Sequence, residues 1–250
     1  MSLGNLSDVE ARAVIAYATA ALAFAAYHFG SRPAFVERLF GPRDDPERAR
    51  TTVSWWRRLW GAAWYGLPAL ALGDAAFPGG AADLYLTAPH GGLAWAATGA
   101  ALVVLAAVMA LGARRPFYPD NYPEVRERAW TAGLTARNAL VWAGYLIAYE
   151  AFYRGLLLAP LVPLVGPVAA VAIMTVLYAL AHLSKNLVET VGALPMGVFY
   201  GWVTLESGSI LPAFTLHVVT AVFADFLGVR AHPAMRFGPR HPADDPAETP

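Results

Sequence analysis

The chain has 250 residues, of which 57% are hydrophobic and only 14% are charged, and its mean hydropathy is +0.44. These values are too apolar for an ordinary soluble domain of this length and predict a protein that crosses a membrane several times. The formal net charge is zero, so no basic field points to nucleic acid. The chain has no cysteine, which excludes disulfides, thiol nucleophiles and Cys-ligated metal sites.

Several apolar segments approach the roughly 20 residues that a helix needs to cross a bilayer. In chain order these segments cover residues 11–29, 59–77, 93–113, 138–159, 163–183, 190–205 and 209–229. The residues before the first segment lack the basic region and the cleavage site of a signal peptide, so we expect this segment to remain as a span. The predicted fold class is therefore an all-α polytopic transmembrane helical bundle with about seven spans.

Basic residues fall in alternate loops. Arginines gather between the first two segments, after the third segment and in the C-terminal tail, and Lys185 lies in a loop on the same side. The loops at 75–92 and 206–209 contain no Lys or Arg. Because basic loops stay cytoplasmic, we expect a multi-pass protein of the inner (plasma) membrane with its N-terminus outside and its C-terminus in the cytoplasm. The high Ala and Arg content, with Lys185 as the single lysine, is typical of a high-GC bacterium.

The composition also divides the chain into three parts. Residues 1–137 form an N-terminal three-span region with Arg-rich cytoplasmic loops, and 138–229 form a core of closely spaced segments. The stretch 51–60 combines three tryptophans with an Arg pair, which is typical of a helix at the level of the lipid headgroups. Residues 230–250 are rich in proline and poor in apolar residues, and we expect them to form a disordered cytoplasmic tail.

Ionisable residues lie inside the apolar segments of the core. Glu150 and Arg154 are four residues apart in one segment, His182 lies in the next, and His217 lies in the last. A charge at mid-membrane costs about 2.5 to 3.5 kcal/mol, so such residues face the bundle interior and are paired. Each feature alone is typical of a structural ion pair or a hydrogen-bonded core histidine. Together, on three neighbouring helices, they predict one shared cavity.

This set of side chains suits hydrolysis of an amide bond. A carboxylate can accept a proton from water, imidazoles can polarise the water or donate to an oxyanion, and an arginine can position the carboxylate. Phosphoryl transfer is disfavoured because the sequence has no Gly-rich phosphate loop. Acyl-enzyme chemistry is disfavoured because no serine lies in a nucleophile elbow and no cysteine exists.

Three motifs appear in order along the core. They are "YEAFYRG" at 149–155, "YALAHL" at 178–183 and "GALPMGVFYGWVTLESGSILPAFTLHVV" at 192–219. This order resembles the CPBP intramembrane proteases, which include the CAAX prenyl endopeptidases and the bacteriocin-processing or Abi proteins. The resemblance covers about 138–229 and implies an all-α membrane core with a four-helix catalytic centre. It also implies endopeptidase activity on a membrane-associated peptide or protein, by CAAX-type processing or related proteolysis.

The resemblance implies roles for four residues. Glu150 occupies the place of the second acid of the family's Glu pair, Arg154 that of its Arg, and His182 and His217 those of its two histidines. In the family the acids and the first histidine activate water, and the last histidine stabilises the oxyanion or holds a metal. No cofactor is certain, but a divalent metal such as zinc could be held by Glu150, His182 and His217.

The sequence departs from the family pattern at two positions. Tyr149 stands where the family has its first Glu, and Ala221 stands where it often has Asn. Tyr149 can donate a hydrogen bond but cannot act as a base near neutral pH. Asp225, Asn186 and Thr220 are candidate replacements for the lost polar groups, although each is also typical of a helix end or of packing.

Two hypotheses from different classes follow. In the first, an active endopeptidase uses Glu150 and His182 to activate water, with Arg154 orienting the carboxylate and His217 binding the oxyanion or a metal. In the second, the chain is a catalytically inactive membrane scaffold or binding protein of the same fold. A proton-coupled transporter is disfavoured because no internal repeat is visible. The expected partners are a peptide or protein substrate in the membrane and the lipid bilayer, without nucleic acid.

Helix geometry raises two further expectations. If the fourth span begins near Asn138, Glu150 lies on the order of 18 Å deep at 1.5 Å per residue, whereas His182 lies near the cytoplasmic end of its own span. A tilt or an extended fifth helix must then bring the two residues to one level. Gly197 and Gly201 form a GxxxG pair, which predicts close approach of a neighbouring helix.

Overall fold

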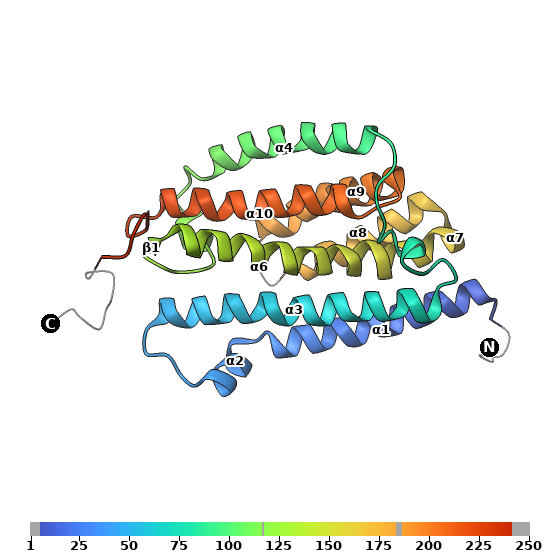
Figure 1. Ribbon diagram of the computed structural model, residues 1–250, viewed down its shortest axis with the longest axis horizontal. Helices are drawn as coiled ribbons and strands as arrows, with labels where there is room; N and C mark the ends of the chain where they lie inside the picture. Colours follow the sequence, from blue (N-terminus) through green and yellow to red (C-terminus); the bar gives the residue numbers. More distant parts are fainter. Residues whose placement is uncertain (1–5, 117, 184–186, 242–250) are drawn as a thin grey trace.

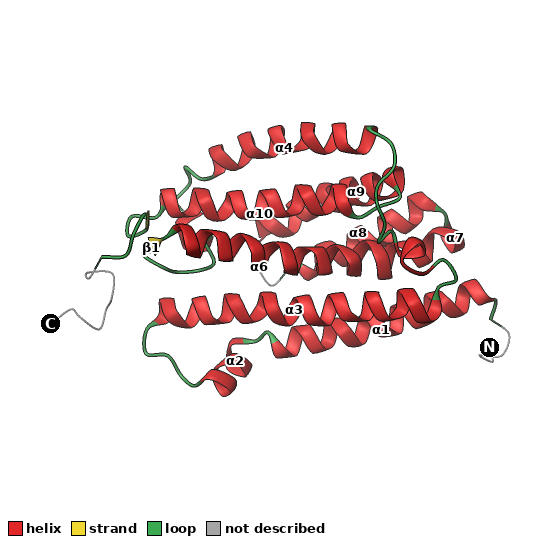
Figure 2. Ribbon diagram, viewed as in Figure 1, coloured by secondary structure: helices red, strands yellow, loops and turns green. Residues whose placement is uncertain are grey.

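The computed structural model describes residues 6–116, 118–183 and 187–241, and it is a bundle of long, roughly parallel and antiparallel helices (Figure 1). The long helices are α1 (Asp8–Gly30), α3 (Pro46–Ala76), α4 (Leu93–Gly112), α6 (Ala132–Glu150), α8 (Pro167–Ala181), α9 (Leu187–Ser207) and α10 (Leu211–Ala231). The short elements are α2 (Pro33–Phe40), η2 (Gly80–Leu84), α5 (Tyr118–Asn121), η3 (Ala151–Leu158), η4 (Ala159–Leu161), α7 (Val162–Val165), β1 (Ala129–Trp130) and β2 (Arg236–Phe237). Helices dominate the chain (Figure 2), which confirms the predicted all-α class.

Each apolar segment predicted from the sequence overlaps a helix. Within the described residues, four helical stretches are long and apolar enough to cross a membrane: Asp8–Gly30, Leu93–Gly112, Ala132–Val165 and Leu211–Ala231. α3 is longer than predicted, and the Trp-rich stretch 51–60 belongs to it instead of forming a separate interfacial helix. α8 has only 15 residues. The protein is therefore a membrane-type helical bundle, while seven spans and the orientation stay predictions.

The helix starts follow from local sequence. Ser7 and Glu10 form a capping box at the start of α1, in which each side chain satisfies a backbone N–H of the other residue. Asp45 accepts a hydrogen bond from the Glu47 N–H at the start of α3, and Pro46 takes the first helical position. The Thr131 side chain accepts from the Leu134 N–H and fixes the start of α6.

α6 lies at the centre of the bundle. α3 packs along one side of it, with α1 beyond, and α10 packs along the other side (Figure 1). α4 lies outermost against α10 and α9, and few of its residues are buried. The buried core runs through both the N-terminal helices and α6 to α10, so α1 and α3 cover one face of the segment that carries Glu150.

α8 and α9 form a closely packed hairpin. A Cβ atom added to Gly197 would lie 2.9 Å from Cγ2 of Thr175, and one added to Gly201 would lie 3.1 Å from Cε of Met174. Larger side chains at these two positions would therefore push α9 away from α8. The close approach predicted from the GxxxG pair is confirmed.

The predicted tail starts at residue 230, and the structure describes its first part. α10 continues to Ala231, and Arg236–Phe237 pairs in parallel with Ala129–Trp130. The Phe237 ring stacks on Phe226 at 5.2 Å, which gives this short stretch an apolar contact on α10. Residues 242–250 lie outside the described residues.

A buried polar network joins α3, α6 and α10 near the end of the bundle where α6 begins. Nη1 of Arg58 donates to Oδ1 of Asn138 at 2.6 Å, and the Arg58 guanidinium covers the Trp142 ring at 3.7 Å. Nδ2 of Asn138 and Nε1 of Trp142 both donate to Oδ2 of Asp225, at 2.8 and 2.7 Å. Nη2 of Arg58 lies 3.7 Å from that carboxylate and 3.2 Å from Oε2 of Glu124.

We call Arg58, Asn138, Trp142 and Asp225 the Arg58 network. Asp225 is a candidate replacement for a polar group lost from the site, with a structural role as the alternative, and its contacts are those of the structural role. Its carboxylate is 1% exposed and is engaged by the other members of the network. A buried carboxylate is stable only with such partners, so Asp225 fixes the position of α10 relative to α3 and α6.

This role predicts a stability defect. Asp225→Leu leaves the Arg58 guanidinium without its buried counter-charge, and we expect the free energy of unfolding to fall by about 3 to 5 kcal/mol. The matched control is Asp74→Leu, which replaces an exposed acid of α3. Reversible unfolding in mixed micelles measures both, and equal stability of the two variants would contradict the role of the network.

Candidate active site

Glu150 reaches the core because of its position on α6. Asn138, Trp142, Leu146 and Glu150 recur every four residues and are all buried, so they lie on one face of the helix. α6 ends at Glu150, and the chain continues directly into the π-helix η3. A π-helix has wider turns than an α-helix and is frequent at functional sites. The carboxylate is 0% exposed.

Two side chains hold the Glu150 carboxylate. Nη1 of Arg154 lies 3.0 Å from Oε2, and Nδ1 of His217 lies 2.6 Å from Oε1. Arg154 belongs to η3 and is also 0% exposed, whereas His217 comes from α10. The opposite charges of Glu150 and Arg154 offset each other in an apolar interior, which is the condition under which such charges are tolerated there.

Arg154 is held mainly by charge and aromatic rings. Its guanidinium carbon lies 4.8 Å from the centre of the Tyr178 ring and 4.9 Å from that of Tyr200, with Tyr153 at 5.9 Å. Within the described residues, none of its nitrogens has a hydrogen-bond partner of good geometry. Cation–π contacts of this kind gain strength where water is excluded, so the tyrosines help to keep the cation buried.

His217 lies among three tyrosine rings. Tyr200 stacks on the imidazole at 5.3 Å, and Tyr149 and Tyr178 meet it edge-on at 5.6 and 6.4 Å. The His217 side chain is 17% exposed, in contrast to Glu150 and Arg154. Of the three side chains in this polar cluster, His217 is therefore the most exposed.

His182 adjoins the cluster through Tyr178. It follows the end of α8, its Nδ1 lies 2.9 Å from the Tyr178 carbonyl oxygen, and the two rings are 4.7 Å apart. The Tyr178 ring thus packs against both His182 and His217. His182 is half-buried.

The depth of His182 follows from the turn at Gly166. This glycine has a φ of 79°, a conformation that side chains other than glycine rarely adopt, and it joins α7 to α8. Glu150 lies 16 residues before Gly166 and His182 lies 16 residues after it. α8 packs back against η3, and the ring of Tyr178, one turn before His182, lies 5.9 Å from that of Tyr149, the neighbour of Glu150.

The four predicted site residues are thus placed in two groups. Glu150, Arg154 and His217 form one polar cluster, and His182 lies on the other side of the Tyr178 ring. Tyr149 fills the position of the family's first acid with a ring packed on His217.

The other candidate replacements do not add a free donor to the cluster. The Thr220 hydroxyl donates to the carbonyl oxygens of Leu216 and His217 in its own helix. Ala221 is partly buried and its side chain carries no polar atom. Asn186 lies outside the described residues.

The predicted metal ligand set is not assembled. In residues 6–116, 118–183 and 187–241, no group of three or more His, Cys, Asp or Glu side chains could hold a metal ion. Nδ1 of His217 is paired with Glu150, and Nδ1 of His182 faces the Tyr178 carbonyl oxygen. In this arrangement of the described residues, Glu150, His182 and His217 do not form the zinc ligand set that the sequence suggests.

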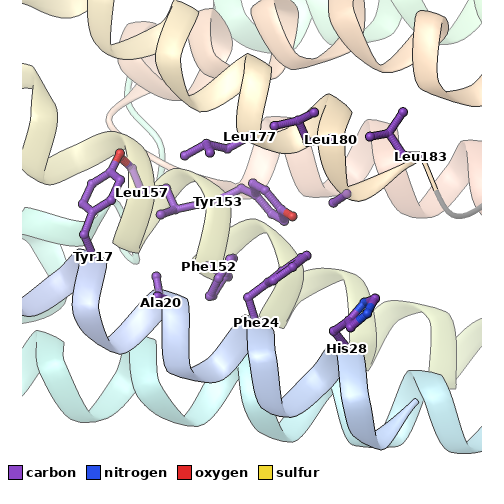
Figure 3. Close-up of a pocket in the computed structure, with 12 residues that line it drawn as sticks. Tyr17, Ala20, Phe24, His28, Phe152, Tyr153, Leu157, Leu177, Leu180 and Leu183 are labelled. Atoms are coloured by element: carbon purple, nitrogen blue, oxygen red, sulfur yellow. The ribbon is translucent and has the colours of Figure 1, made fainter. Parts of the chain in front are cut away.

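An apolar groove of about 510 Å³ runs between α1 and α8 beside the cluster (Figure 3). Tyr17, Phe24 and His28 of α1 face Leu177, Leu180 and Leu183 across it, with Phe152, Tyr153 and Leu157 of η3 between the two rows. Leu180 and Leu183 are 53% and 64% exposed, so the groove is open to the side of the bundle. Its lining includes both neighbours of His182 in the sequence, Ala181 and Leu183.

The loop between α3 and α4 covers the end of the bundle where α9 turns into α10. The Ile210 N–H donates to the Tyr85 carbonyl oxygen at 3.0 Å, and the Ser209 hydroxyl donates to that of Thr87 at 2.6 Å. The His90 N–H donates to the Ser207 carbonyl oxygen at 2.9 Å, and Leu84 is fully buried. These contacts fix the loop to that end of the bundle.

Tyrosines are the site residues that the sequence reasoning missed. Tyr178 and Tyr200 cover Arg154 and also contact His217, yet neither was singled out as a site residue. A signal existed for Tyr178, because it lies four residues before His182 and therefore shares a helical face with it. Tyr200 lies in the GxxxG stretch of α9, where no comparable pattern in the sequence points to the site.

Comparison with known families fits this geometry. The family model for the Rce1-like type II CAAX prenyl endopeptidases matches residues 131–223, a segment that contains Glu150, Arg154, His182 and His217. This match supports the resemblance to the CPBP intramembrane proteases that the motif order predicts. Searches of the curated proteins and of the solved structures gave no significant match.

The buried ion pair predicts a non-additive effect on stability. Glu150→Leu leaves the Arg154 cation buried without a counter-charge, and we expect the free energy of unfolding to fall by about 3 to 5 kcal/mol. The double variant Glu150→Leu/Arg154→Leu removes both charges and should recover much of this loss. Glu206→Leu, at an exposed acid of α9, is the control. Additive losses in the double variant, measured by reversible unfolding in mixed micelles, would show that the pair does not exist.

Proposed function

We propose that the protein is an intramembrane endopeptidase that hydrolyses a peptide bond of a membrane-associated peptide or protein, with water activated by glutamate and histidine. The observation that carries this proposal is the 2.6 Å contact between Glu150 and His217, made within the segment that matches the type II CAAX prenyl endopeptidases. A carboxylate paired with an imidazole is a common acid–base unit for activating water. The half-buried His182 supplies a further polar group on the other side of the Tyr178 ring.

The groove supports a lipid-modified substrate. Its lining is almost entirely aliphatic and aromatic, it opens to the side of the bundle, and it ends beside His182. The similarity of residues 131–223 to the CAAX prenyl endopeptidases supports prenylated protein substrates in a lipid environment. We infer that the prenyl chain of the substrate lies in the groove between α1 and α8, which places the adjoining peptide bond near the cluster.

We also propose in which membrane the protein lies, how it is oriented there, and what each part of the chain does. The distribution of Arg in the sequence supports insertion in the inner (plasma) membrane with the C-terminus in the cytoplasm. Residues 138–229 then act as the catalytic core. Residues 1–137 contribute α1 and α3 as a wall of the groove and a support for α6. Residues 230–250 form the cytoplasmic tail.

A catalytically inactive scaffold of the same fold is the second candidate. Tyr149 replaces an acid with a packed aromatic ring, and the remaining Glu150 carboxylate is fully buried. Both features are compatible with a cluster that serves only structure. In that case the groove would bind a lipid-modified protein without cleaving it.

Turnover of defined peptides separates these two functions. Purified protein in liposomes should cleave a farnesylated CAAX-type peptide, and Glu150→Gln and His182→Ala should each lower kcat by about 10²-fold or more because they remove acid–base groups. His90→Ala, in the covering loop, is the control and should keep wild-type turnover. Equal turnover in all four proteins, or none in any of them with prenylated and unprenylated peptides, would favour the scaffold.

Filling the groove should affect prenylated substrate selectively. Ala21 lines the groove, whereas the next residue, Leu22, is 72% exposed outside it. We expect Ala21→Trp to raise KM for a farnesylated peptide by roughly 10-fold or more, because the indole occupies space needed by several buried methylenes. Leu22→Trp should leave KM unchanged. A measurement in which both variants bind the farnesylated peptide as tightly as wild type would place the prenyl chain elsewhere.

A further inference from the structure

We propose that a second pocket, at the end of the bundle where α1 begins, binds the headgroup of a zwitterionic phospholipid with a primary ammonium group, as in phosphatidylethanolamine. Arg12 and Tyr85 hold the phosphate, and Asp83 holds the ammonium group. This pocket, called the Arg12 pocket below, is separate from the groove between α1 and α8. Lipid binding there does not depend on whether the protein hydrolyses a peptide.

Four parts of the chain enclose the Arg12 pocket, which has a volume of about 420 Å³. They are the first turns of α1, the end of α3, the segment of η2 with Tyr85, and the corner between η4 and α7. The start of α1 and α7 lie at the same end of the bundle, opposite to the start of α6 (Figure 1). Two stretches long enough to cross a membrane, Asp8–Gly30 and Ala132–Val165, begin and end here. Lipid headgroups lie at the ends of such spans, so the pocket faces them.

Arg12 gives the pocket a cation. Its side chain is half-buried in the lining, and within the described residues it makes no hydrogen bond or ion pair. The segments that form this end, 6–16, 70–95, 159–168 and 203–214, contain no other Lys or Arg. A guanidinium presents its N–H donors in a plane that matches the oxygens of a phosphate group. The Arg12 pocket therefore has a cation that lacks a counter-charge from the protein.

Tyr85 adds a second donor. Among the described residues it is the only one other than glycine with a positive φ, at 57°, and such a strained backbone is typical of functional sites. Its N–H donates to the Ala82 carbonyl oxygen, and its own carbonyl oxygen accepts from the Ile210 N–H. The Tyr85 hydroxyl has no hydrogen-bond partner within the described residues. This hydroxyl can donate to a second phosphate oxygen.

The acids around the pocket favour a zwitterion over an anion. Asp83 lines the pocket, and its Oδ2 accepts from the Gly79 N–H at 2.9 Å, which holds the carboxylate in place. Asp8, Glu10 and Asp74 lie at the same end of the bundle. A headgroup with a net negative charge is repelled by these acids, whereas an ammonium group is attracted and can donate to Asp83.

The rest of the lining is apolar and favours a membrane lipid over a soluble phosphate ester. Val9, Phe77 and Val162 line the pocket. Apolar side chains that follow in α1 and α7 face outward, since Val14 is 50% exposed and Leu164 is 40% exposed. An apolar surface therefore continues from the pocket along the side of the bundle, where the acyl chains of a bound lipid can lie.

Native mass spectrometry of the full-length protein, titrated with phosphatidylethanolamine or phosphatidylglycerol, tests this site. We expect the wild type to bind phosphatidylethanolamine about 5-fold or more tightly than phosphatidylglycerol. Arg12→Gln should weaken phosphatidylethanolamine binding by about 10-fold, because it removes a charge-assisted contact, and Arg12→Lys should recover most of it. Asp83→Asn still accepts from the Gly79 N–H but should lose the preference between the two lipids. Arg43→Gln, at an exposed arginine before α3, is the control and should bind like the wild type.

Three outcomes would overturn the proposal. They are equal wild-type affinity for the two lipids, unchanged binding in Arg12→Gln, and Arg12→Lys binding as weakly as Arg12→Gln. Glycerophosphoethanolamine, which is the same headgroup without acyl chains, should not displace the lipid at equal concentration. Displacement would assign the pocket to a soluble phosphate ester and contradict a lipid site. Because none of these measurements uses turnover, their failure leaves the proposed hydrolytic function untouched.

Discussion

The structure depends on one constraint, which is that a carboxylate and a guanidinium cannot remain in an apolar helical bundle unless each is paired. Glu150 and Arg154 meet at 3.0 Å with both side chains 0% exposed, and the pair is surrounded by His217 from α10 and by the rings of Tyr178 and Tyr200 from α8 and α9. Side chains from α6, η3, α8, α9 and α10 therefore meet at this one ion pair. Any reaction at this cluster takes place among side chains in fixed positions, because moving one side chain of the ion pair would leave a buried charge uncompensated.

The Arg58 network obeys the same constraint near the start of α6. Arg58 and Asp225 are held by Asn138 and Trp142, and they join α3 to α6 and α10. Since α6 carries Glu150 and α10 carries His217, this network sets the relative position of the two helices whose side chains meet at 2.6 Å. The N-terminal helices are thus more than a membrane anchor: α3 fixes the core, and α1 supplies one wall of the groove.

Much of this arrangement follows from the sequence, because insertion in a membrane limits where charge can be placed. The apolar segments predict the long helices, and the rarity of mid-membrane charge selects Glu150, Arg154 and His217 as members of one site. The wide turns of η3, the partner of Asp225 and the split between His217 and His182 could not be predicted. Each depends on packing between helices that are distant in sequence, such as Arg58 against Asn138, and single-segment patterns do not encode those contacts. The same packing decides whether Glu150, His182 and His217 converge, and in the described residues they do not form a group that could hold a metal ion.

The most direct test of this account is a high-resolution experimental structure of the protein in a lipid nanodisc, in which the separation of Oε1 of Glu150 and Nδ1 of His217 is measured. The account predicts a hydrogen-bonding distance near the 2.6 Å found here, with the Arg154 guanidinium on the opposite carboxylate oxygen. An imidazole that faces away from Glu150, beyond hydrogen-bonding reach, would contradict it.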